Sequence, residues 1–77
     1  MASNLTKQEK ELLMDLMVVL KQDAQLAYED TVMVAIQINT TEKLEALKEW
    51  LRTKREGKYF HLTANELLNK TAQISRM

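Results

Sequence analysis

The chain lacks proline and has a single glycine, Gly57, among its 77 residues. Proline disrupts a helix by removing a backbone donor, and glycine is common just past a helix end, so two strong helix breakers are nearly missing. We therefore predict a mainly α fold, a small three- or four-helix bundle. A chain this short holds one small core, so residues 1–77 should form a single helical domain with a flexible N-terminus at 1–6 and a frayed C-terminus at 75–77.

A capping box predicts that the first helix starts near Lys7. The Thr6 hydroxyl accepts from a first-turn amide, and the Glu9 carboxylate reaches back to the Thr6 amide. Apolar residues then recur at alternating spacings of four and three, which predicts a buried helical stripe. The stripe consists of Leu13, Met17, Leu20, Ala24 and Ala27, widened by Leu12 and Leu16. One helix of about thirty residues, or two helices with a break near residues 22–30, both fit this spacing.

Residues 31–38 fit two different structures. Four β-branched residues alternate with other types, which is typical of a half-buried strand. They are Val32, Val34, Ile36 and Ile38. The alternative fold class is therefore α+β, with a short strand at 32–38 paired across a dimer. We favour a helix, because a lone strand needs a mate and the other candidate segment, residues 59–62, is short.

Two further helices are predicted in the second half of the chain. Residues 42–56 follow capping side chains at 39–41 and carry acids near their start and cations near their end, before Gly57. Their apolar stripe is Leu44, Leu47, Trp50 and Leu51, in which the tryptophan is expected to anchor the core. Thr63 and Glu66 form a second capping box, which predicts a last helix over 64–74. Its expected buried face is Leu67, Leu68, Thr71 and Ile74.

Composition argues against several classes of function. Lysine plus arginine number 11, as do aspartate plus glutamate, so no net charge draws the chain to nucleic acid or to an anionic membrane. The chain has no cysteine and one histidine, His61, so we expect no metal site and no cofactor. The sequence offers no activated nucleophile and no glycine-rich phosphate loop, so we predict neither an enzyme nor a small-molecule substrate.

The sequence also predicts where the protein works. No uninterrupted apolar run approaches the roughly 20 residues that a membrane-spanning helix needs. The first seven residues do not resemble a secretory signal, and a cysteine-free chain is typical of the cytoplasm. We therefore expect a cytoplasmic protein with no membrane partner.

The segment 52–61 combines cations with aromatic rings. Cations bind phosphates, and rings stack on bases, so this pattern suggests an accessory nucleic-acid-binding protein. The candidate contacts are Arg52, Lys54, Arg55, Lys58 and Tyr59. The alternative is structural, because cations are common at helix C-termini and these rings could close the core.

The first half of the chain carries more apolar residues than one helical stripe needs. A small monomer cannot readily hide them all, so a protein partner or a second copy is expected to cover some. The candidate interface residues are Leu12, Leu16, Val32 and Ile36. Our leading hypothesis is therefore a small non-enzymatic interaction module, a protein-binding or adaptor protein, with nucleic-acid binding through residues 52–61 as the alternative.

Overall fold

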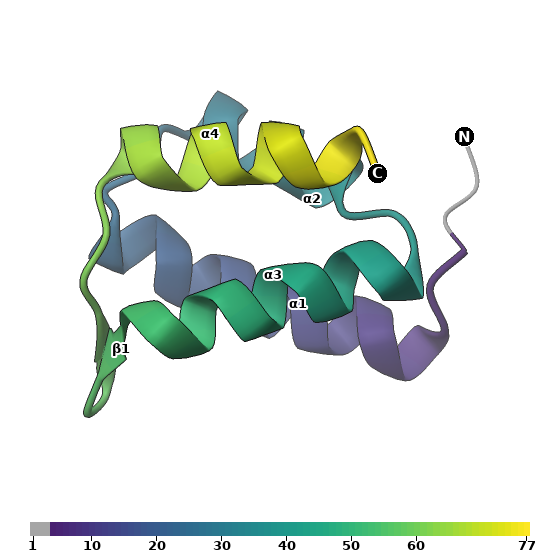
Figure 1. Ribbon diagram of the computed structural model, residues 1–77, viewed down its shortest axis with the longest axis horizontal. Helices are drawn as coiled ribbons and strands as arrows, with labels where there is room; N and C mark the ends of the chain where they lie inside the picture. Colours follow the sequence, from purple (N-terminus) through teal and green to yellow (C-terminus); the bar gives the residue numbers. More distant parts are fainter. Residues whose placement is uncertain (1–3) are drawn as a thin grey trace.

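Four helices and one short hairpin make up the computed structural model, which describes residues 4–77. Their order is α1 (Lys7–Asp23), α2 (Tyr28–Gln37), α3 (Thr41–Lys54), β1 (Arg55–Glu56), β2 (Tyr59–Phe60) and α4 (Ala64–Ser75). In Figure 1, α2 and α4 lie above α1 and α3; α2 packs on both α1 and α4, and α4 also packs on α3. The prediction of a mainly α bundle is confirmed.

Both predicted capping boxes are present. The Thr6 hydroxyl accepts from the Glu9 amide at 3.1 Å, and the Glu9 carboxylate accepts from the Thr6 amide at 2.9 Å. Thr63 and Glu66 repeat this exchange at the start of α4. Each pair satisfies two of the backbone donors that a helix N-terminus leaves without a partner, which fixes where α1 and α4 begin.

The first half of the chain forms two helices rather than one. Ala24 caps α1, Gln25 adopts a positive φ of 54°, and the Leu26 amide donates to the Lys21 carbonyl at 3.1 Å. This is the six-to-one bond of a Schellman motif, whose left-handed position glycine usually occupies. Leu26 is buried, so the apolar contact that accompanies the motif offsets the cost of a non-glycine residue there.

The alternative of a strand at 32–38 is wrong. These residues belong to α2 and its C-cap, and Val34 and Ile38, four residues apart, are both fully buried. Helix spacing buries this pair, whereas strand spacing would have buried all four β-branched residues together. The segment that might have paired with such a strand, β2, pairs with β1 instead.

The third helix ends two residues before the predicted residue 56. Arg55 and Glu56 leave α3 and pair with Phe60 and Tyr59 in an antiparallel hairpin, whose two-residue loop is Gly57–Lys58. Gly57 has a φ of 62°, as the first loop position of a type II′ turn requires. The glycine therefore reverses the chain within a hairpin instead of simply ending a helix. The last helix, predicted over 64–74, runs one residue further, to Ser75.

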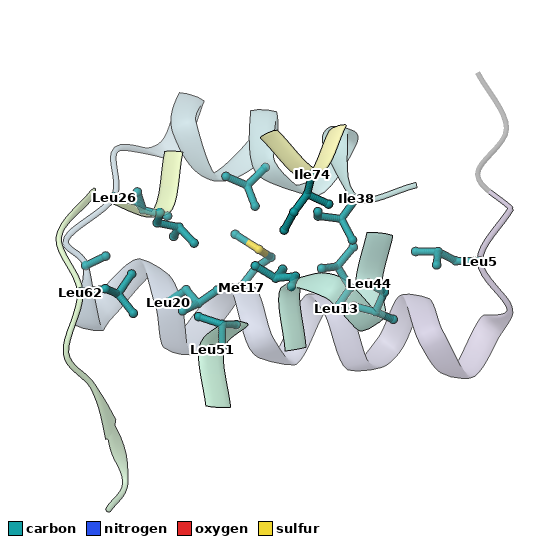
Figure 2. Close-up of a cluster of buried hydrophobic side chains, with 14 residues drawn as sticks. Leu5, Leu13, Met17, Leu20, Leu26, Ile38, Leu44, Leu51, Leu62 and Ile74 are labelled. Carbon is teal, nitrogen blue, oxygen red and sulfur yellow. The ribbon is translucent and has the colours of Figure 1, made fainter. Parts of the chain in front are cut away.

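The core lies between the two layers and is almost entirely aliphatic. Figure 2 shows side chains from all four helices meeting there, with Leu26 and Leu62 at one end and Leu5 at the other. Trp50 only packs on the edge of this core. Within the segment 1–6, which was expected to be flexible, Leu5 is buried and the Asn4 amide donates to the Asn39 carbonyl at 3.0 Å. Residues 1–3 lie outside the described residues.

Candidate functional site

Helix α1 exposes apolar side chains on both sides of its buried stripe. Leu13, Met17 and Leu20 of the predicted stripe are buried, with Ala24 at the cap, whereas Ala27, which was predicted to continue the stripe, is exposed at the start of α2. On one side lie Leu12, Leu16 and Val19, and on the other lie Met14 and Val18. The two sides face different neighbours, so the predicted interface residues divide between two surfaces.

The first surface is a groove between α1, α3 and the hairpin, which we call the hairpin groove. It consists of two adjoining hollows of about 300 and 260 Å³, which share Leu12, Leu16, Arg55 and Phe60. The first hollow adds Lys48, Leu51 and Arg52, and the second adds Asp15, Val19 and Lys58. Its floor is therefore aliphatic and aromatic, and its rim is mostly cationic.

Phe60 lines both hollows of this groove, and the hairpin that carries it is bonded to two helices. The Phe60 amide donates to Asp23 Oδ2 at 2.9 Å, which joins β2 to the end of α1. The His61 amide donates to the Lys54 carbonyl at 2.7 Å, which extends the hairpin back to α3. The guanidinium of Arg55 lies 5.8 Å from the centre of the Phe60 ring, as expected for cross-strand neighbours on one face.

The rim cations are not all neutralised by neighbours. Lys48 pairs with Glu45 at 3.4 Å, and Arg52 pairs with Glu49. Within residues 4–77, no carboxylate lies within ion-pair distance of Arg55 or Lys58, and Asp15 is the one acid that lines the groove. Because the whole chain has no net charge, this surface holds a local excess of positive charge.

The predicted basic-aromatic segment is divided by the fold. Arg52, Arg55 and Lys58 line the hairpin groove. Lys54 instead donates to Glu66 Oε2 at 3.0 Å and lies over the Trp50 ring, at a polar hollow between α3 and α4. Tyr59 is 68% exposed and pairs with Glu56, so it alternates away from the face that Phe60 and Arg55 share.

The second surface, which we call the α1–α2 face, contains the other predicted interface residues. Met14 and Val18 of α1 meet Tyr28 and Val32 of α2 around a hollow of about 250 Å³. The remaining lining residues are Met17, Lys21, Thr31 and Ala35. Ile36 follows Val32 by one helical turn and is 67% exposed. The lining of this hollow is more apolar than that of the hairpin groove, and Lys21 is the one charged residue in it.

The sequence-based prediction missed five residues that line the groove, which are Asp15, Val19, Lys48, Leu51 and Phe60. Helical spacing could have placed Lys48, Leu51, Arg52 and Arg55 on one face, since they follow one another by three, one and three residues. No sequence signal could have placed Phe60 against α1, because that contact depends on the hairpin and on the Asp23 bond.

Two carboxylates have perturbed acidity, and both are helix caps. The Thr6 amide lowers the pKa of Glu9, and a hydrogen bond from Lys54 lowers the pKa of Glu66. In the described part of the chain, no three histidine, aspartate or glutamate side chains gather closely enough to hold a metal ion. These pKa shifts therefore arise from the hydrogen bonds of the two capping boxes and from Lys54.

Comparison with known proteins adds no relative. No protein family, no curated protein and no solved structure was found to match this chain. Among residues 4–77, no helix is both long and apolar enough to cross a membrane.

Proposed function

We propose that the protein is a cytoplasmic, non-enzymatic binding module, and that the hairpin groove holds a segment of another protein. The observation that carries this proposal is the convergence of two sets of residues far apart in the sequence. Leu12 and Leu16 form an apolar floor, and Arg52, Arg55 and Lys58 lie along its edge. An apolar centre with a polar rim is the general anatomy of a protein interface.

The shape of the groove favours a protein segment over a small molecule. Pockets for small molecules span about 300–1,000 Å³ and place several polar groups inside a concave site. The two adjoining hollows form an open groove instead of an enclosed site, and their charged groups are mostly long cationic side chains at the edge. An open groove of this kind suits the side chains of a partner that continues beyond it.

A second role, self-association, is proposed for the α1–α2 face. The charged residue that lines its hollow is Lys21 alone, so two copies can meet there without opposing several like charges. Sedimentation equilibrium is expected to give a mass that rises with concentration, and Val32→Asp should abolish the rise. Leu12→Gln, which alters the other surface, should leave it unchanged. A monomeric mass at every concentration would contradict this role.

The groove is tested by selecting helical peptides from a random displayed library against the wild-type protein. Enriched peptides are then titrated into ¹⁵N-labelled wild type, Leu12→Gln and Met14→Gln. Leu12 and Met14 are exposed residues on opposite sides of the same helix, at 43% and 62%, so both variants should stay folded. We expect amide shifts around residues 12–19 and 51–60, and weaker binding for Leu12→Gln but not for Met14→Gln.

Two results would overturn the proposal. One is a selection that enriches no peptide above background. The other is a set of binders whose affinity does not depend on Leu12 and whose shifts fall outside the groove. Duplex DNA is titrated in parallel at low and moderate salt, because shifts over residues 52–61 that retreat with salt would instead favour nucleic-acid binding.

A further inference from the structure

We infer that the partner segment is an acidic amphipathic helix, with its apolar face on Leu12, Leu16 and Phe60 and its carboxylates against Arg55 and Lys58. This inference rests on the proposed function, because it names the chemistry of the segment that the hairpin groove would hold. Two observations carry it: the spacing of the floor residues and the charge of the rim.

The floor has the length and spacing of two helical turns. Leu12, Leu16 and Val19 follow one another along α1 by four and three residues, so they extend over about 10 Å at 1.5 Å per residue. A helix that lies alongside α1 presents apolar anchors at matching intervals of three or four residues. An added strand fits less well, since β1 and β2 have two residues each and offer little edge for pairing.

The rim specifies the sign of the partner's charge. Four cations line the groove with one carboxylate, Asp15, and two of these cations already have acidic neighbours. Arg55 donates its Nε to the Gly57 carbonyl at 2.9 Å, but neither its remaining guanidinium donors nor Lys58 has an acidic partner among residues 4–77, so both cations can face carboxylates of the partner. A partner with cations at these positions would place like charges opposite each other. This repulsion disfavours a basic partner more strongly than the attraction favours an acidic one.

A phosphate backbone would use the same cations but not the floor. Nucleic acid gains affinity from cation–phosphate contacts, and it would leave the apolar surface of Leu12 and Leu16 uncovered. The fold has also placed Lys54 against Glu66 and turned Tyr59 to the opposite face of the hairpin. The groove therefore favours an acidic protein helix over duplex DNA, which becomes an outcome of the test.

The test uses the enriched peptides in three charge versions with identical apolar residues. The flanking positions carry glutamate, glutamine or lysine, and each version is titrated at low and moderate salt. We expect the glutamate version to bind about two- to thirtyfold more tightly than the glutamine version, the ratio given by two exposed charge pairs. Added salt should narrow this ratio, because rim charges are screened.

A pair of charge-reversal variants assigns the effect to the rim. Arg55→Glu with Lys58→Glu should reverse the preference between the glutamate and lysine versions. Lys10→Glu with Lys70→Glu changes the net charge equally, but neither residue lines the groove, so the preference should persist. Circular dichroism of all variants checks that the bundle remains helical.

The possible outcomes separate this inference from the proposed function. Binding in the groove with no dependence on peptide charge, or a preference for lysine, would overturn the acidic partner and leave the binding module standing. A failure to enrich any peptide would overturn both. Duplex DNA that displaces the best glutamate peptide, and whose affinity depends on Arg55 and Lys58 but not on Leu12, would replace the acidic helix with nucleic acid.

Discussion

Asp23 is the residue whose removal best tests how the hairpin is held. Its carboxylate accepts the Phe60 amide at 2.9 Å in a partly buried position, and Asp23→Ala would leave that amide without its partner. A hydrogen bond to a charged group contributes about 1.5–3 kcal/mol, and partial access of water lowers the loss to roughly 1–2 kcal/mol. Asp23 is also the last residue of α1, where its negative charge interacts unfavourably with the negative end of the helix dipole. Removing this charge should therefore stabilise the fold by about 0.3–1 kcal/mol.

The hydrogen bond is the larger of these two effects, so we expect Asp23→Ala to destabilise the fold by about 1 kcal/mol. For a domain of this size, that loss lowers Tm by about 4–8 °C. Urea unfolding followed by circular dichroism measures the free energy of unfolding, and hydrogen exchange of the Phe60 amide measures the local effect. We expect the Phe60 amide to lose more protection than amides in the middle of α3.

Asp15 supplies the matched control for this experiment. It is an exposed aspartate in the same helix and makes no hydrogen bond or ion pair among the described residues, so Asp15→Ala should leave stability unchanged or slightly raised. If Asp23→Ala unfolds at the same urea concentration as Asp15→Ala, and the Phe60 amide exchanges at its wild-type rate, the bond does not hold the hairpin and the argument fails.

Three further perturbations test other parts of the structure. Thr63→Ala removes a hydroxyl that caps α4 and should cost about 1 kcal/mol in urea unfolding; an unchanged midpoint would contradict the cap. In Gly57→Ala the added Cβ would have no atom within 4 Å, so the expected loss of about 1 kcal/mol in the free energy of unfolding should come from the positive φ alone. Because the pKa of Glu66 is lowered in the folded state, its stabilisation is present above the ordinary value of 4.5 and is lost as pH falls through the folded value. Lys54→Met should therefore reduce the loss of stability on acidification. If the free energy of unfolding depends on pH as in the wild type, Lys54 is not the main cause of the lowered pKa of Glu66.

The helices were predictable because their determinants are local. The capping boxes at Thr6 and Thr63 depend on residues three positions apart, and the buried stripe of α1 repeats within one helix. The break after Asp23 was harder, because a Schellman motif without glycine depends on the burial of Leu26, which only the assembled core provides. The predicted end of α3 at residue 56 was wrong for a similar reason, because strand pairing with residues 59–60 outweighs the helical preference of Arg55 and Glu56.

The candidate site was predictable in its parts but not in its assembly. The apolar surplus of α1 and the cations after residue 51 are both visible in the sequence. Their meeting is not visible, since it requires the hairpin to fold back over α1 and the Asp23 carboxylate to hold it there. The same geometry keeps Lys54 and Tyr59 out of the groove. Lys54 pairs with Glu66, and Tyr59 lies on the opposite face of the hairpin from Phe60.

The position of the hairpin therefore determines both the shape and the charge of the groove. Strands of two residues are too short to be stable alone, so the position of Phe60 depends on the Asp23 bond, on Arg55 and on the aliphatic side chains beneath it. Leu12 and Leu16 line the groove together with Phe60 and form its floor. A chain with equal numbers of acids and bases gains a positive surface in this way, because folding places Arg55 and Lys58 along one edge without acidic partners, while Glu49 pairs with Arg52 and Glu66 with Lys54.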